Sequence, residues 1–276
     1  MIKILDGNSK EINWTFNRFP DNQLQFVIDR QGAENARVMQ ISITGDDELI
    51  LFFQSLQVLK MISKIEIKYF YGARSDKTMA GTNRVCCVAD WFYQTITNYY
   101  STGNSFIDIL APHCDDLLIN RYIGDINEGL LKLDFDLPEC LNLDDYDLLV
   151  FPDESAQRRV KTGDKESITC QKNRDQSTGE ILSHFIPEIP EGTKRILVLD
   201  DLCDGGRTFK NIIMESGLGN AKVDLFVFHG VFSNNALKSI LRYYDRVFVS
   251  NSLEAPEQQR SRLSADQDRV IIFNVW

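Results

Sequence analysis

The chain has 276 residues, 43% of them hydrophobic and 25% charged, an ordinary balance for a globular protein with one large or two average domains. Its formal net charge is −10, which argues against non-specific binding to nucleic acid or to an anionic membrane. A signal peptide is not expected, because the apolar start is too short and soon becomes acidic, and no apolar run is long enough to span a membrane. Because the six cysteines show no C-x-x-C spacing, a reduced, cytoplasmic protein is expected.

Strand patterns and helix patterns alternate along the chain. The pattern predicts parallel sheets joined by crossover helices, because parallel strands need such connections. We place a first domain over 1–138 and a second over 139–276, and the last strand either stays in the second domain or returns to the first. Strands are expected over 23–28, 38–43, 64–69, 106–110, 147–151, 196–199, 223–228 and 246–249, and helices over 46–62 and 84–100.

The segment RILVLDDLCDGGRTF, residues 195–209, has the most informative pattern. A buried strand over 196–199 is expected to end at two carboxylates, Asp200 and Asp201. A Gly-Gly turn follows, and Thr208 then opens a helix that is expected to run over 209–216. A strand, a glycine loop and a helix N-terminus together form a cradle for an anion. The adjacent acids suggest a sugar phosphate, and the alternative is an ordinary turn whose acids face solvent.

This segment resembles the phosphoribosyl-pyrophosphate-binding loop of the phosphoribosyltransferase fold. In that loop two acids hold the ribose 2- and 3-hydroxyls, and a D-T-G-G-T turn holds the 5-phosphate. The resemblance implies that Asp200 and Asp201 hold the sugar, with Arg207 in place of one glycine of the turn. The residues expected to hold the phosphate are Asp204, Gly205, Gly206, Arg207 and Thr208.

Further segments resemble, in the same order along the chain, those of the ribose-phosphate pyrophosphokinases. YFYGARSDK, residues 69–77, matches a segment whose Arg and Asp contact ATP, and RFPDNQ, residues 18–23, matches a loop that reaches a neighbouring subunit's ATP. The resemblance implies ATP-binding roles for Phe19, Asp21, Arg74, Asp76 and His113, and metal-binding roles for His113 and Asp153. QKNR, residues 171–174, lies where the family has its catalytic D-K-R-R segment, so Lys172 and Arg174 are the expected catalytic residues.

Several of these residues also have a structural interpretation. Arg74 could be a solvent-facing loop cation, Asp153 a turn residue after a proline, and the 163–179 segment a solvated charge run rather than a mobile lid over phosphates. His229 is expected to pack rather than to react. Where the family has a metal-binding acid the chain has Ala111, and Gln23 replaces another acid.

The resemblance implies an α/β fold with two phosphoribosyltransferase-like domains, each a mainly parallel sheet flanked by helices. It implies a diphosphokinase that transfers the β,γ-pyrophosphoryl group of Mg-ATP to the anomeric hydroxyl of ribose 5-phosphate, with Mg²⁺ as cofactor and a homo-oligomeric state. Some phage relatives of the family are similar in motif and act on ADP-ribose in NAD⁺ rebuilding. Arg207 suits such an acceptor, because arginine binds an additional phosphate well. A phosphoribosyltransferase and a non-catalytic synthetase-associated subunit are the alternatives from other classes.

Overall fold

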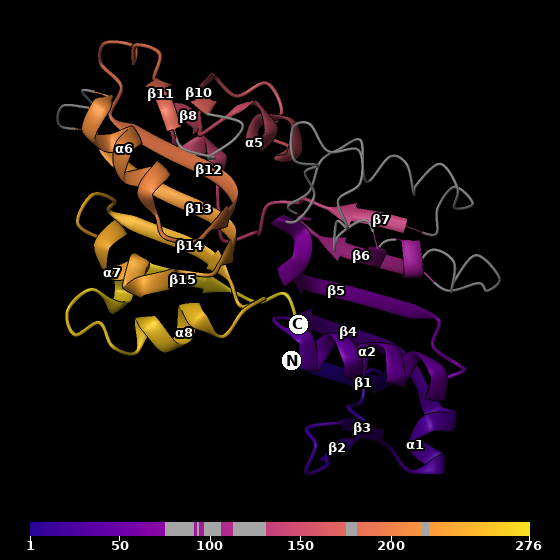
Figure 1. The fold of residues 1–276 in the computed structure, drawn as a ribbon. Helices are drawn as coiled ribbons and strands as arrows, with labels where there is room; N and C mark the ends of the chain where they lie inside the picture. Colours follow the sequence, from indigo (N-terminus) through magenta and orange to yellow (C-terminus); the bar gives the residue numbers. More distant parts are fainter. Residues whose placement is uncertain (75–90, 93, 97–105, 113–130, 175–180, 217–220) are drawn as a thin grey trace, which may run out of the picture. The chain divides into compact units, whose positions relative to one another are not determined.

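The computed structural model describes residues 1–74, 91–92, 94–96, 106–112, 131–174, 181–216 and 221–276. The chain divides into two compact units, Met1–Asp134 and Phe135–Trp276. Each unit has a sheet and a hydrophobic core of its own (Figure 1). Within the described residues, no helix is long and apolar enough to cross a membrane.

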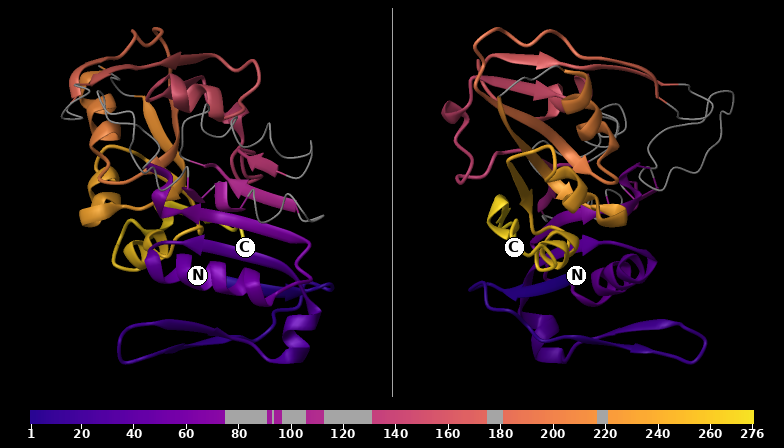
Figure 2. Two further views of the ribbon diagram at one scale, coloured as in Figure 1. Left: turned by 45° about the vertical axis from the view of Figure 1, so that its right-hand side comes forward. Right: turned by 90° about the vertical axis from the view of Figure 1, so that its left-hand side faces the viewer.

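The first unit is built on a five-stranded sheet and carries a separate two-stranded hairpin. Its elements are β1 (Ile2–Asp6), β2 (Thr15–Arg18), β3 (Leu24–Val27), α1 (Arg30–Asn35), β4 (Ala36–Ile43), α2 (Asp46–Val58), β5 (Lys64–Phe70), the 3-10 turn η1 (Tyr71–Arg74), β6 (Phe106–Leu110) and β7 (Leu131–Asp134). The sheet order is β1-β4-β5-β6-β7, and all neighbours are parallel except β1 and β4. The β2–β3 hairpin is the indigo ribbon at the bottom of both views in Figure 2.

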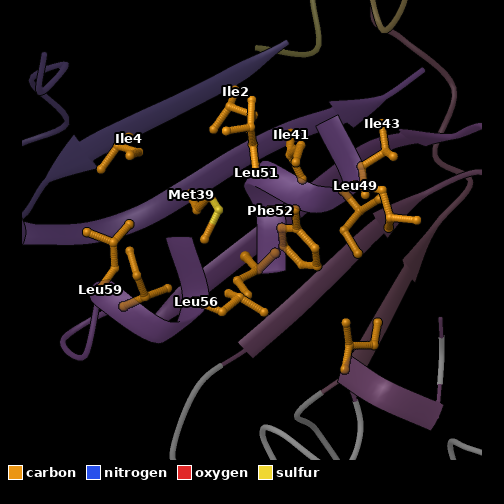
Figure 3. Packing of buried hydrophobic residues seen from close by; sticks show 14 of the residues in the cluster. Ile2, Ile4, Met39, Ile41, Ile43, Leu49, Leu51, Phe52, Leu56 and Leu59 are labelled. Atoms are coloured by element: carbon orange, nitrogen blue, oxygen red, sulfur yellow. The ribbon is translucent and has the colours of Figure 1, made fainter. Parts of the chain in front are cut away.

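Helix α2 covers one face of this sheet because its apolar residues recur at helical spacing. Leu49, Phe52 and Leu56 are buried, and Figure 3 shows them facing the side chains of β1 and β4. Strand residues alternate in direction, so Met39 and Ile41 of β4 point into this core. The opposite face of the sheet carries polar and charged side chains instead.

The second unit is built on a six-stranded sheet of order β15-β14-β13-β12-β8-β9, in which every pair is parallel. Helices α6 and α7 supply buried residues to the core on one face of the sheet (Figure 1). The elements are η2 (Leu143–Asp145), β8 (Leu148–Phe151), α5 (Glu154–Arg159), β9 (Ser167–Thr169), β10 (Gln171–Arg174), β11 (Ile181–Phe185), β12 (Arg195–Cys203), α6 (Arg207–Glu215), β13 (Lys222–Gly230), η3 (Ser233–Asn235), α7 (Ala236–Ile240), β14 (Arg246–Ser250), α8 (Ala255–Arg260), η4 (Gln267–Arg269) and β15 (Val270–Phe273).

The expected fold class, α/β with mainly parallel sheets flanked by helices, is confirmed. Two details differ from expectation. Strand β12 does not end before the acids but continues through them to Cys203, because it stays paired with β13 up to Gly230. Part of the expected 163–179 loop is strand, since β9 extends the sheet and β10 pairs with β11. Of the two places left open for the last strand, β15 takes the one in the second sheet, where it pairs with β14. Of the expected 84–100 helix, only 91–92 and 94–96 lie within the described residues, and these are helical.

Candidate functional site

The loop between β12 and α6 has the geometry of an anion cradle. Gly206 lies immediately before α6 in the left-handed region, with φ of 72°, and no side chain caps the helix. A Cβ at this position would lie 2.8 Å from the Cδ1 atom of Ile240, so a side chain here would have to displace Ile240, and the positive φ also favours glycine. The first turn of α6 contains no acid, and its first residue is the exposed Arg207. Its N-terminal N–H groups and positive dipole end therefore suit an anionic group.

The two acids before this loop lie in different environments. Because β12 continues through them, consecutive side chains point to opposite faces of the sheet. Asp201 is only 1% exposed, and its Oδ2 atom accepts a hydrogen bond of 2.5 Å from Nη1 of Arg159. Asp200 is partly exposed, and its Oδ1 atom accepts a 2.8 Å hydrogen bond from the backbone N–H of Asp201. The structure thus leaves Asp200 as the acid with access to solvent.

Cys203 is the last residue of β12, and its thiol is in an environment that makes it unreactive. The side chain is buried, and its backbone oxygen accepts hydrogen bonds from the N–H groups of Val231 and Phe232. Burial, and then the negative charges of Asp200 and Asp204, raise the pKa of the Cys203 thiol well above its usual range. The residue therefore stays a neutral thiol at physiological pH and anchors the loop through its backbone.

Asp153, the expected metal ligand of this unit, is the N-cap of α5. Its Oδ1 atom accepts a 3.0 Å hydrogen bond from the backbone N–H of Ala156. The side chain lies just after the carboxyl end of β8, the strand next to β12 in the sheet. Among the residues that the structure describes, no group of three or more acids, histidines or cysteines could hold a metal ion. Asp153 therefore offers one carboxylate at this edge of the sheet, beside a strand that ends in Asp200 and Asp201.

His229 lies at the carboxyl end of β13, opposite Leu202 of β12. It is 2% exposed, and its Nδ1 atom lies 2.9 Å from the Oγ atom of Ser252. A buried, hydrogen-bonded imidazole agrees with the packing role expected for it.

In the first unit, two of the segments expected to bind ATP meet the same helix end. Arg18, at the end of β2, forms an ion pair with Asp47 in the first turn of α2. The hydroxyl of Tyr71, in the 3-10 turn that ends at Arg74, donates a hydrogen bond to Asp46 of the same turn of α2. This hydrogen bond raises the pKa of Tyr71 to about 12. Helix α2 therefore fixes the base of the hairpin and the backbone that carries Arg74.

The tip of the β2–β3 hairpin carries Phe19 and Asp21. A 2.9 Å hydrogen bond from the backbone N–H of Phe19 to the backbone oxygen of Gln23 closes the turn. The backbone N–H of Gln23 in turn donates a 3.2 Å hydrogen bond to Oδ1 of Asp21. The side chain of Phe19 is 43% exposed. An ordered turn with an exposed aromatic ring is suited to contact with another molecule.

The remaining expected site residues are placed only in part. Lys172 and Arg174 lie on β10, where Lys172 pairs with His184 of β11. Asp76 and His113 lie outside the described residues. Ala111, at the position of the family's metal-binding acid, is fully buried directly after β6 and has a φ of 37°. Sequence reasoning missed Arg159, because the dipeptide Arg158-Arg159 does not reveal which side chain turns inward.

Comparison of the sequence with known proteins gives one family-level similarity. No family model matches the chain. A ribose-phosphate pyrophosphokinase from Thermoplasma volcanium is 25% identical over 256 residues, which cover 86% of this chain and 82% of that protein. The resemblance to ribose-phosphate pyrophosphokinases is confirmed. It extends over most of both chains, so it includes both units and is not limited to the phosphate loop. At the level of the family, the chain is similar to pyrophosphokinases and thus to transferases.

Proposed function

We propose that this chain is a diphosphokinase that transfers the β,γ-pyrophosphoryl group of Mg-ATP to the anomeric hydroxyl of ribose 5-phosphate, giving phosphoribosyl pyrophosphate and AMP. The observation that carries the proposal is the β12–α6 loop, with the partly exposed acid Asp200 before it and an uncapped helix N-terminus after it. The similarity to the Thermoplasma volcanium ribose-phosphate pyrophosphokinase supports the same reaction. The second unit would then bind the sugar phosphate and the first unit ATP.

In this reaction the anomeric oxygen attacks the β-phosphorus in line, the bond from that phosphorus to the α,β-bridging oxygen breaks, and AMP leaves. The chain's task is to position the two substrates and to neutralise charge. Asp204, Gly205, Gly206, Arg207 and Thr208 would hold the 5-phosphate through the amides and dipole of α6. Lys172 and Arg174, as cations, would stabilise the transferring group, and Phe19, Asp21, Arg74, Asp76 and His113 would seat ATP.

The residues fit a magnesium ion that arrives with the nucleotide. Mg²⁺ in nucleotide sites is bound by one or two carboxylates together with substrate phosphates, so a dedicated cage of three protein ligands is not needed. Asp153 offers a hard oxygen donor at the carboxyl edge of the sheet of the second unit. We propose His113, in the first unit, as a further metal ligand. The ion would neutralise charge on the phosphates.

ADP-ribose is a second candidate acceptor, and Arg207 is the observation that favours it. This residue is exposed at the first position of α6, where a cation is unfavourable next to the positive end of the helix dipole. An acceptor with a second phosphate beyond the 5-phosphate would compensate for that charge, and arginine binds such a group bidentately. The product would be ADP-ribose pyrophosphate.

The test is AMP release from Mg-ATP with ribose 5-phosphate and ADP-ribose offered separately, followed by the mass of the product. Pyrophosphate gained by ribose 5-phosphate supports the first reaction, and gain by ADP-ribose alone supports the second. Arg207→Ala should weaken use of ADP-ribose more than use of ribose 5-phosphate if the second holds. ATP binding without AMP formation from either acceptor would favour a non-catalytic subunit, and pyrophosphate release that depends on a nucleobase would favour a phosphoribosyltransferase.

A further inference from the structure

The β2–β3 hairpin packs on the first core through its second strand. Strand β3 buries Leu24 and Phe26 in that core, whereas all four residues of β2 are exposed. The ring of Phe26 also stacks on that of Trp14, with centroids 5.2 Å apart. An isolated two-stranded hairpin is marginally stable in water, so this hairpin depends on the contacts of β3. Apolar contacts are not directional, and by themselves they do not fix how the hairpin lies along helix α2.

The side chain of Gln54 makes directional contacts between α2 and β3. Its Oε1 atom accepts a 2.7 Å hydrogen bond from the backbone N–H of Phe26, and its Nε2 atom donates a 2.8 Å hydrogen bond to the backbone oxygen of Leu24. A glutamine amide carries an acceptor and a donor side by side, as a peptide group does. Gln54 therefore bonds to the edge of β3 where a neighbouring strand would pair, and it fixes the position of β3 along the helix.

A second polar contact between the hairpin and α2 lies on the same face of the helix. Asp47 precedes Gln54 by seven residues, a spacing that places both side chains on one face. Asp47 forms an ion pair with Arg18, which directly precedes Phe19 at the hairpin tip. The two side chains of this pair are 41% and 55% exposed, so the pair contributes little stability. The partly buried hydrogen bonds of Gln54 are therefore the stronger polar contact.

We propose that Gln54 is a positioning residue for ATP binding, because it holds the β2–β3 hairpin so that Phe19 and Asp21 at its tip can contact the nucleotide. This inference rests on the proposed function, in which the tip belongs to the ATP site. Loss of the Gln54 amide leaves the N–H of Phe26 and the backbone oxygen of Leu24 without this partner in a partly buried place. The hairpin must then shift to bring these groups to water, and the tip moves with it.

Steady-state kinetics of Gln54→Leu test the proposal. Leucine has nearly the volume of glutamine but makes neither hydrogen bond, so KM for ATP should rise about tenfold. The value of kcat and the KM for the acceptor should stay within about twofold, because the substitution affects only the placement of ATP. Gln57→Leu is the matched control, since Gln57 is an exposed glutamine of the same helix, and this variant should change none of these values.

A double-mutant cycle with Phe19→Ala separates positioning from a general loss of stability. If Gln54 acts through the tip, Gln54→Leu should raise the KM for ATP much less once Phe19 has been truncated, so the two effects should not multiply. Full multiplication of the two effects overturns the proposal, because Gln54 would then act independently of the tip. An unchanged KM for ATP in Gln54→Leu overturns it as well.

Hydrogen exchange tests the attachment of the hairpin without reference to activity. Backbone amides over residues 15–27 should exchange roughly tenfold faster in Gln54→Leu than in the wild type, and at the wild-type rate in Gln57→Leu. Equal exchange in Gln54→Leu and the wild type would overturn the inference while the proposed function stands. A wild-type chain that forms no AMP from Mg-ATP with either acceptor overturns the proposed function, and with it the role of Gln54 in ATP binding, whatever the exchange rates are.

Discussion

Gly206 is the residue on which the shape of the phosphate loop most directly depends. Its left-handed backbone and its contact with Ile240 both disfavour a side chain. Gly206→Ala should lower the free energy of unfolding by about 1–3 kcal/mol, through backbone strain and overpacking. Gly205 is a matched control, since it is exposed and a Cβ there would meet nothing within 4 Å. Denaturant unfolding of both variants tests this, and equal stabilities would contradict the geometry of the loop.

Ala111 shows at the residue level why the family's acid is missing. The side chain is fully buried, and its φ of 37° lies in the left-handed region. Ala111→Asp would restore the family's residue type but bury a carboxylate, so we expect a loss of stability of about 3 kcal/mol or more. Ala111→Gly removes the backbone strain but raises the conformational entropy of the unfolded chain. These effects oppose each other, so the free energy of unfolding should change by no more than about 1 kcal/mol. Thermal unfolding compares the two variants, and a fully stable Ala111→Asp would show that the position tolerates an acid.

Among elements, β5 contributes a charged ladder on the face of the first sheet opposite to α2. Glu66 accepts hydrogen bonds from Lys64 and Lys68, each at 2.7 Å, and from Gln40 of β4 at 2.9 Å. Burial opposes ionisation of Glu66, but the hydrogen bonds from Lys64, Lys68 and Gln40 outweigh it and lower its pKa to about 2 from 4.5. A pKa lowered by folding stabilises the protein above the unfolded-state pKa, and this contribution is lost as pH falls through the folded-state pKa.

We therefore expect Glu66→Gln to cost on the order of 2–3 kcal/mol of unfolding free energy at neutral pH. The difference from wild type should shrink as pH falls from 4.5 toward about 2. Urea unfolding at a series of pH values measures it. Glu34 provides the control, because its pair with Arg30 is strongly exposed and Glu34→Gln should cost about 0.5 kcal/mol or less. A pH-independent difference for Glu66→Gln would contradict the ladder.

The elements also show what sequence could and could not predict. Apolar strands such as β4, β5 and β13 were predictable from their sequences. Their β-branched and aliphatic residues either form a continuous apolar run or alternate with polar residues. Strand β12 was predicted too short, since two adjacent acids normally end a strand, and here a distant arginine compensates for one of them. The polar strands β2, β9 and β10 were missed because their sequences carry no hydrophobic periodicity. The loop glycines were predictable as a motif, whereas the burial of Asp201 depended on a tertiary contact.

At the scale of the whole molecule, the two hydrophobic cores share no residue. One core contains buried residues from Ile2 to Ile109 and the other from Leu148 to Val270. Both units have the size of ordinary domains, which generally fold around a core of their own. The structural boundary at 134/135 lies four residues before the 138/139 boundary proposed from sequence. The difference is significant because it assigns Phe135 to the second unit.

Phe135 is 8% exposed, and its ring packs edge-on against Phe228 of β13 with centroids 6.2 Å apart. We expect a fragment of residues 135–276 to fold and to be more stable than one of 139–276, by about 3 kcal/mol, the cost of deleting a buried phenylalanine side chain. Phe135→Ala in the longer fragment should remove most of this difference. Asp136→Ala is the control, since that residue is exposed and should change stability by about 0.5 kcal/mol at most. Equal unfolding midpoints for the two fragments would mean that the ring contributes nothing to the second unit. If Phe135→Ala makes the 135–276 fragment about as unstable as the 139–276 fragment, then the four residues 135–138 stabilise the second unit mainly through the Phe135 side chain. The domain boundary would then lie before Phe135, because its ring packs against Phe228 of the second unit.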